Sequence, residues 1–170
     1  MTLLLSRSDL EELLDVGGCL AMLRRGFLAE PSPIAAQRVR TDLPGPGTAT
    51  ALIPGLVEGV PAYTVKVNAK FPGARPALRG VVCLHDARSG ELLALLDSAT
   101  VTAWRTGLSA ADIAGTLSQV LRGTVPGRLT DAEVTVYTPV GLPWQDLALA
   151  WAAYHQARAA GRGREVDLLA

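Results

Sequence analysis

The sequence predicts an α+β fold in which an antiparallel sheet packs against helices. Between residues 35 and 96, short apolar runs alternate with proline and glycine, a pattern typical of strands joined by turns. Two of these runs, residues 80–86 and 91–97, flank a short segment with turn residues at both ends, so we expect them to pair as an antiparallel hairpin. Apolar residues before and after this region recur at helical spacing, which indicates helices on both sides of it in the sequence.

Two short helices are expected at the start of the chain. Ser8 and Glu11 have the spacing of a capping box, and leucines at helical spacing follow them. Gly17 and Gly18 interrupt this pattern, so we expect a second amphipathic helix after them, ending near Pro31.

The middle of the chain is predicted to be mostly β. Its five strand-like runs are residues 37–43, 48–56, 61–70, 80–86 and 91–97. In the third run, Thr64, Lys66, Asn68 and Lys70 alternate with two valines and an alanine, so the polar and the apolar side chains point to opposite faces of the strand. One of these two faces is expected to be buried.

After the predicted sheet the sequence returns to helical spacing. Thr100 can cap a helix whose apolar residues carry it to about Leu121. Residues 133–138, which read Glu-Val-Thr-Val-Tyr-Thr, form a further predicted strand.

The segment Gly-Leu-Pro-Trp-Gln-Asp then opens the last helix. Pro143 or Trp144 falls in its first turn, where Asp146 is favourably placed for the helix dipole. The helix is expected to end before Gly161, and residues 165–170 either add an edge strand or trail off.

Composition and charge limit the kind of protein. The 170 residues fit one domain, or a small domain with an appendage, and a core of ordinary size, and a second full domain does not fit. Lysine plus arginine and aspartate plus glutamate number 16 each, so no overall field favours nucleic acid or an anionic membrane as a partner. The leading Met-Thr-Leu-Leu-Leu-Ser run is too short for a signal peptide, and no apolar stretch reaches the roughly 18 residues of a membrane helix. We therefore expect a cytoplasmic protein.

The sequence predicts neither a metal nor a cofactor. Cys19 and Cys83 lie inside apolar segments without CxxC spacing or a nearby histidine cluster, so we expect reduced structural thiols rather than a metal site or a disulfide. A dinucleotide site needs Gly-x-Gly-x-x-Gly between a strand and a helix, and a nucleotide site needs a Walker A sequence. Neither signature occurs in the sequence.

The two halves of the chain resemble two parts of one protein family. Residues 101–115, which read Val-Thr-Ala-Trp-Arg-Thr-Gly-Leu-Ser-Ala-Ala-Asp-Ile-Ala-Gly, continue directly into residues 116–150. The later segment contains Gly-Leu-Pro-Trp-Gln-Asp, which is similar to a Gly-x-Ala-x-Gln-Asp signature with Pro143 in place of the alanine. Through these segments the chain resembles the ornithine cyclodeaminase/mu-crystallin family.

The resemblance implies a particular domain and assembly. In that family a substrate-binding and dimerisation domain is built from both chain ends and is interrupted by a Rossmann domain that binds a nicotinamide cofactor. Here the N-terminal part, residues 1–115, meets the C-terminal part, residues 116–170, with no such insertion. The expectation is therefore one substrate-binding and dimerisation domain, residues 1–170, and a homodimer in which two sheets pair with the pocket near their interface.

The resemblance also implies a carboxylate-binding site. Arg38, Lys66 and Arg105 stand at the positions where the family holds the carboxylate of its amino-acid substrate. Taken alone, Lys66 also fits a solvated lysine on the polar face of a strand. Arg40 lies on the same strand face as Arg38 and competes with it, and either arginine also fits a surface residue.

Arg105 requires an anion because of the residues around it. Val101 and Leu108 flank it on the predicted helix, so its guanidinium emerges from a largely apolar surface. Asp112 can supply the anionic partner, and a ligand carboxylate can do so through two parallel hydrogen bonds.

Lys66 is the candidate catalytic residue. Neighbouring cations and desolvation would lower the pKa of its amine, which would then serve as a base or as a Schiff-base nucleophile. Secondary candidates are Lys70, Asp86, His85 and Tyr63. His85 also fits a strand-end histidine and Asp86 a residue that holds the turn, and His155 is expected on the exposed face of the last helix.

Three functions from different classes are open. The family's deamination uses a hydride relay through the cofactor and an acidic residue of the inserted domain, so redox cyclodeamination is disfavoured here. The favoured hypothesis is a non-redox enzyme of bacterial specialised metabolism that acts on a small amino-acid-derived carboxylate by imine or enamine cyclisation, isomerisation, hydrolysis or elimination. One alternative is a catalytically silent carboxylate-binding or dimerisation partner of a full-length family member. The other is a split enzyme whose nucleotide domain comes from another polypeptide.

Overall fold

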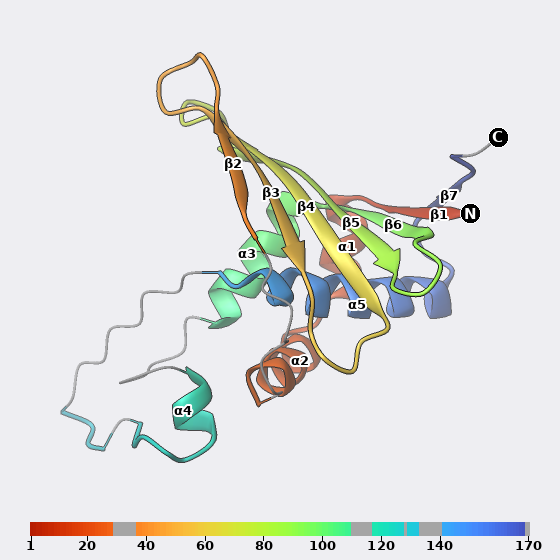
Figure 1. Cartoon of the computed structure of the whole chain (residues 1–170). Helices are drawn as coiled ribbons and strands as arrows, with labels where there is room; N and C mark the ends of the chain where they lie inside the picture. Colours follow the sequence, from red (N-terminus) through yellow and green to blue (C-terminus); the bar gives the residue numbers. More distant parts are fainter. Residues whose placement is uncertain (29–36, 110–116, 128, 133–140, 169–170) are drawn as a thin grey trace.

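The computed structural model describes residues 1–28, 37–109, 117–127, 129–132 and 141–168 (Figure 1). The strands are β1 (Thr2–Leu5), β2 (Val39–Asp42), β3 (Ala49–Gly55), β4 (Ala62–Lys70), β5 (Leu78–Asp86), β6 (Leu92–Asp97) and β7 (Arg164–Val166). The helices are α1 (Arg7–Leu13), α2 (Val16–Leu28), α3 (Ser98–Ser109), α4 (Leu117–Leu121) and α5 (Pro143–Ala160). One sheet and the helices packed on it make an α+β fold, so the predicted fold class is confirmed.

The sheet has the strand order β2-β3-β4-β5-β6-β1-β7. Strands β2 to β6 pair antiparallel in chain order, which confirms the predicted run of strands and the hairpin between β5 and β6. β1 pairs parallel with β6, and β7 pairs antiparallel with β1, so the complete sheet is mixed rather than wholly antiparallel. β1 has no counterpart among the predicted strands, because four residues are too few to display a period. β7 corresponds to the edge strand expected at the end of the chain.

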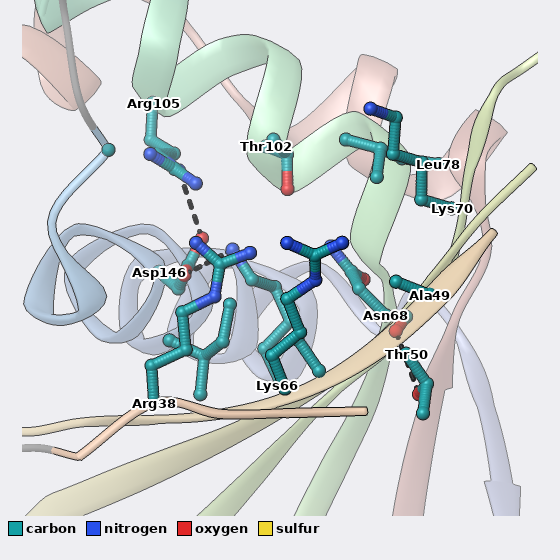
Figure 2. A pocket seen from close by; sticks show the side chains of 14 residues that line it. Arg38, Ala49, Thr50, Lys66, Asn68, Lys70, Leu78, Thr102, Arg105 and Asp146 are labelled. Atoms are coloured by element: carbon teal, nitrogen blue, oxygen red, sulfur yellow. Dashed lines mark hydrogen bonds and ion pairs between the residues drawn. The ribbon is translucent and has the colours of Figure 1, made fainter. Parts of the chain in front are cut away.

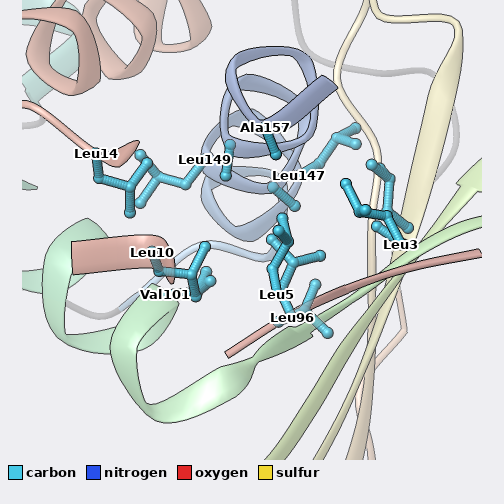
Figure 3. Packing of buried hydrophobic residues seen from close by; sticks show 14 of the residues in the cluster. Leu3, Leu5, Leu10, Leu14, Leu96, Val101, Leu147, Leu149 and Ala157 are labelled. Carbon is cyan, nitrogen blue, oxygen red and sulfur yellow. The ribbon is translucent and has the colours of Figure 1, made fainter. Parts of the chain in front are cut away.

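The helices cover one face of the sheet (Figure 1). α5 runs across this face and contacts β3, β4 and β5 as well as α1, α2 and α3. Between helices and sheet lies a core of leucine, valine and alanine side chains, among which Leu10, Leu84, Leu96, Val101 and Leu147 are at most 1% exposed (Figure 3). Burial of such side chains stabilises the fold by about 1.5–3 kcal/mol each, which fixes α5 against the sheet.

The polar face of β4 is the one that lies under the helices. Thr64, Lys66 and Asn68 are at most 8% exposed, whereas Val67 on the opposite face is 37% exposed. The predicted alternation is confirmed, and its buried face carries the polar side chains. Among the described elements, none covers the outer, apolar face of the sheet (Figure 1).

The first helix begins two residues earlier than predicted. Ser6, not Ser8, is the N-cap of α1: its hydroxyl accepts a hydrogen bond from the Asp9 N–H at 3.4 Å, and its own N–H donates to Asp9 Oδ2 at 2.8 Å. Ser6 follows directly on β1, so the end of that unpredicted strand sets the start of the helix.

The next two helices each follow directly on an aspartate that caps them. The break between α1 and α2 falls at Leu14 and Asp15, and the paired glycines lie inside the first turn of α2, where Asp15 Oδ1 accepts the Gly18 N–H at 2.7 Å. At α3, Asp97 Oδ2 accepts the N–H of Thr100 at 2.8 Å and its hydroxyl at 2.6 Å, so Asp97 rather than Thr100 caps the helix.

The last helix follows the prediction, and two other predicted features lie outside the described residues. α5 begins at Pro143 and ends at Ala160, before the C-cap residue Gly161, which has a left-handed backbone with φ 62°. The strand predicted at 133–138 lies outside the described ranges, as does the stretch 110–116 of the predicted continuous helix between α3 and α4. None of the described helices combines the length and the apolar character needed to cross a bilayer.

Candidate functional site

A cavity of about 300 Å³ lies between the sheet and helices α3 and α5 (Figure 2). Its polar lining residues are Arg38, Arg40, Thr50, Lys66, Asn68, Lys70, Thr102, Arg105 and Asp146. The three residues predicted to bind a carboxylate, Arg38, Lys66 and Arg105, are all among them. Three cations from separate segments of the sequence therefore meet at one cavity of the size that ligand sites have.

Lys66 lies buried at the floor of this cavity. Its side chain is 1% exposed, so the alternative of a solvated lysine is wrong. Its Nζ donates a hydrogen bond to Asp146 Oδ2 at 2.5 Å. Burial lowers the pKa of the Lys66 amine below its ordinary 10.5; the Asp146 carboxylate opposes this, and Arg105 and Arg38 lower the pKa further. The amine therefore loses a proton more readily than that of an ordinary lysine.

Arg105 reaches the same carboxylate from α3. It is 8% exposed, and its Nε donates to Asp146 Oδ1 at 3.2 Å. Asp146 is thus an anionic partner of this arginine, whereas Asp112 lies outside the described residues. The guanidinium occupies the space above Gly141, where an added Cβ would fall 0.9 Å from Nη1. A residue other than glycine at position 141 would displace the guanidinium.

Asp146 is positioned by the start of α5. Pro143 begins the helix, and the Leu142 N–H donates to Gln145 Oε1 at 3.0 Å, which closes the first turn. Asp146 follows in that turn, is 1% exposed and faces both buried cations (Figure 2). The sequence predicted this aspartate only as a favourable charge for the helix dipole, so its central role was missed.

A signal for the role of Asp146 is present in the sequence. The residue directly precedes the apolar run 147–153, which makes the helix buried on most of its sides. A carboxylate at the head of such a run is buried with the helix and requires a cation there.

A close contact between β3 and α5 holds the start of this helix in place. A Cβ added at Gly55 would lie 2.4 Å from the Pro143 carbonyl oxygen and 2.5 Å from Thr64 Oγ1, so only glycine lets the two segments meet. On the other side, the Trp144 ring packs edge-on against Phe27 of α2, with ring centroids 4.9 Å apart. The first turn of α5 is therefore held by both the sheet and α2.

The mouth of the cavity carries further cations. Arg38, Arg40 and Lys70 are exposed and line it. Arg38 and Arg40, the two alternatives that the sequence offered for one carboxylate-binding arginine, therefore both line the cavity. Arg40 Nη2 lies 2.5 Å from Asp42 Oδ1, in a pair whose side chains are 59% and 74% exposed. A pair exposed to this degree contributes little to stability and exchanges partners readily.

The wall toward α3 adds two uncharged polar groups. The Ser98 hydroxyl donates to Asn68 Oδ1, which fixes the orientation of that amide. Thr102 Oγ1 is buried and has no hydrogen-bond partner within the described part of the chain. Buried hydroxyls nearly always have a partner, so this oxygen suits a polar group of a ligand.

The secondary candidates divide between the cavity and the hairpin. Lys70 lines the cavity, whereas Tyr63 and His85 stack on each other with ring centroids 4.9 Å apart, outside its lining. Asp86 accepts backbone N–H groups of the turn, which lowers the pKa of its carboxyl and confirms that it holds the turn. His155 is exposed on α5, as predicted.

The cysteines are free thiols, and the described residues contain no cluster of side chains that could hold a metal ion. Cys19 is buried, and burial raises the pKa of its thiol to about 11. Both observations fit structural cysteines.

The described helix starts do not fit a dinucleotide cofactor. Its pyrophosphate needs open N–H groups at a helix N-terminus. A carboxylate already stands in or beside the first turn of each described helix longer than five residues: Asp9, Asp15, Asp97 and Asp146. Asp9, Asp15 and Asp97 would repel a phosphate group at the starts of α1, α2 and α3, and Asp146 at the start of α5 is already bound to Lys66 and Arg105.

Comparison with known proteins relates the chain to one family. The ornithine cyclodeaminase/mu-crystallin family matches residues 107–161, a segment that includes Gly-Leu-Pro-Trp-Gln-Asp. No protein of curated function matches the sequence. The match confirms the resemblance to this family, which is named after an enzyme.

Solved structures share the fold. An archaeal alanine dehydrogenase dimer with bound NAD superposes with a TM-score of 0.79 at 14% identity, over 99% of this chain and 99% of that chain. A Δ1-pyrroline-2-carboxylate reductase of Thermococcus litoralis, in complex with NADH and L-proline, superposes with a TM-score of 0.80 at 16% identity, over 97% of this chain and 100% of that chain. A probable ornithine cyclodeaminase of Bordetella pertussis Tohama I superposes with a TM-score of 0.52 at 23% identity, over 64% of this chain and 34% of that chain. At these identities the likeness establishes the fold, and function has to be argued from the site.

Replacing Asp146 with asparagine should destabilise the protein by about 3–5 kcal/mol, because it leaves Lys66 and Arg105 buried without their shared anion. Urea unfolding at neutral pH measures the change in the free energy of unfolding. The matched control is Asp42→Asn, which removes an exposed ion pair and should cost less than about 1 kcal/mol. Equal effects of the two substitutions would contradict the ion triad.

The lowered pKa of Lys66 should be visible as a pH dependence of stability. Between the pKa of the folded protein and the ordinary 10.5, the unfolded chain binds a proton at this lysine that the folded protein does not bind. The free energy of unfolding therefore rises with pH through this window because of Lys66. We expect the stability of the wild type relative to Lys66→Met to increase as pH rises toward 10.5, measured by urea unfolding at several pH values. A difference that is constant with pH would show that burial does not shift this pKa.

Proposed function

We propose that the chain, of which residues 107–161 match the ornithine cyclodeaminase/mu-crystallin family, is a non-redox enzyme that acts on a small amino-acid-derived carboxylate. One observation carries this proposal: Lys66, Asp146 and Arg105 form a buried ion triad at the floor of a cavity. Well-packed apolar residues of similar volume would stabilise a fold as well as such a triad does. The triad is therefore better explained by ligand binding and proton transfer than by stability.

The cations suit the carboxylate of the substrate. Arg38 approaches the cavity from the segment before β2, opposite Arg105 on α3 (Figure 2). A planar guanidinium matches the geometry of a carboxylate, and two of them on opposite walls fix the orientation of a bound molecule. The reacting part of the substrate then lies over the amine of Lys66.

Lys66 supplies the proton transfer. In an imine-to-enamine isomerisation, a base removes a proton from the carbon next to the C=N bond. The electron pair of that C–H bond forms the C=C bond, and the π electrons of the C=N bond take up a proton at nitrogen. No electrons leave the substrate, so the step needs no oxidant or reductant. The Lys66 amine suits this base, and Asp146 at 2.5 Å stabilises its protonated form.

Two observations support a reaction without a nicotinamide cofactor. The sequence contains no dinucleotide fingerprint, and the helix starts of the described chain carry carboxylates where a pyrophosphate would bind. Cyclisation of an imine or enamine, isomerisation, hydrolysis and elimination all proceed by proton transfer and are the reaction classes that fit this site.

The outer face of the sheet supports a homodimer formed by the single domain of residues 1–170. Exposed apolar side chains gather there at neighbouring register positions: Leu52 of β3 opposite Val67 of β4, and Val67 opposite Val81 of β5. A contiguous apolar patch of this kind on a sheet is typical of a protein interface. The same face favours a second candidate function, a catalytically silent carboxylate-binding partner that pairs with a full-length family member.

Proton exchange tests the enzymatic proposal. Candidate cyclic imino acids and keto acids are incubated with the protein in D2O, and loss of the proton next to the C=N or C=O group is followed by NMR. Lys66→Met should slow the exchange by about 100-fold or more while a thermal-shift assay still detects the ligand. Arg88→Met, which removes an exposed cation outside the cavity, should exchange like the wild type. Ligand binding without exchange in the wild type would favour the silent partner.

Light scattering coupled to gel filtration tests the assembly. Val67→Lys places a charge on the outer face of the sheet and should convert the dimer to a monomer. Leu20→Lys on α2 changes a side chain of similar exposure, 42% against 37%, and should leave the dimer intact. A monomeric wild type that forms a mixed dimer when a full-length relative is added would replace the homodimer with the second candidate.

A further inference from the structure

The charges that line the cavity do not balance. Its described lining contains five cations and one carboxylate: Arg38, Arg40, Lys66, Lys70, Arg105 and Asp146. Asp146 already bonds two of the cations, so the remaining positive charge has no counterpart among the lining residues that the structure describes. The Asp42 partner of Arg40 is 74% exposed and does not line the cavity.

The cations form an inner and an outer group along the strands. Lys66 and Arg105 meet at the floor. Asn68 lies two residues further along β4 on the same face, about 7 Å from Lys66. Ala51 of β3 pairs with both Asn68 and Arg40, so Arg40 lies in the same row of paired residues across the sheet as Asn68. Lys70 lies one row beyond. Arg40 and Lys70 are therefore set back from the inner group by the length of a small molecule.

The space between the two groups is lined by small or uncharged residues. Ala49 and Ala51 of β3 form one side, and neither fills the cavity. On the other side the buried hydroxyl of Thr102 faces this space without a partner in the described chain (Figure 2). This region accommodates the middle of a ligand and offers it one hydrogen bond.

Resting on the proposed function, we propose that the natural ligand carries two separated anionic groups and no ammonium group. Its first carboxylate binds between Arg38 and Arg105, and a second carboxylate or a phosphate binds to Arg40 and Lys70. A zwitterionic amino acid would place its ammonium among five cations, next to a carboxylate that is already paired twice. A dianion instead places one negative charge beside each of the two groups and halves the excess positive charge of the lining.

Calorimetric titration with matched ligands tests this assignment. 2-Oxobutyrate carries one carboxylate, 2-oxoglutarate carries a second one at the far end of the chain, and 3-phosphoglycerate carries a carboxylate and a phosphate. The wild type should bind at least one of the two ligands with a second anionic group about tenfold or more tightly than 2-oxobutyrate, and the tighter of the two identifies the second group. The double variant Arg40→Gln/Lys70→Gln should lose this preference and keep its affinity for 2-oxobutyrate within about twofold. Arg88→Gln is the control for removal of an exposed cation and should behave as the wild type.

The outcomes separate the inference from the proposed function. Equal affinities of the wild type for all three ligands, or an equal loss for mono- and dianions in the double variant, would overturn the inference. If Arg105→Gln still abolished binding of 2-oxobutyrate in that case, the carboxylate site would stand. If the wild type bound none of the three ligands, both proposals would fall.

Discussion

The carboxylate of Asp146 is the group on which the site depends, because it compensates two buried cations at once. Lys66 comes from β4 and Arg105 from α3, and neither could be kept from water without an anion. The shared carboxylate also ties the sheet, α3 and α5 together, so it shapes the cavity above it. The same carboxylate therefore compensates the charges of Lys66 and Arg105 and holds together the elements that line the cavity.

Much of the fold could be predicted because the ends of most strands and helices are marked by residues at those ends. The middle strands are bounded by proline and glycine, and α5 starts at a proline and stops at a left-handed glycine, Gly161. β1 could not be predicted, because four residues show no period and its partner β6 lies about 90 residues away in sequence. The first cap was misplaced for the same reason, since Ser6 and Ser8 are equivalent until the end of β1 is known.

The site was predicted in part. Resemblance indicated Arg38, Lys66 and Arg105, and all three line the cavity. Alternation along β4 separates two faces but does not tell which one the helices cover, so Lys66 could equally have been solvated. Its pairing with Asp146 joins residues 80 positions apart and leaves no trace in local spacing. The available clue was that Asp146 stands at the start of an apolar helix, because a carboxylate buried with such a helix requires a cation beside it.

The contact at Gly55 has a consequence for which parts of the cavity can change shape. Since the backbone of β3 touches the start of α5 there, these two segments cannot move closer, and the floor of the cavity, where Asp146 lies 2.5 Å from Lys66, is tightly packed. The arginine and lysine side chains at the mouth have long stems that reorient at small energetic cost. A ligand of the proposed kind would therefore be accommodated by movement of the side chains at the mouth of the cavity and not by its floor.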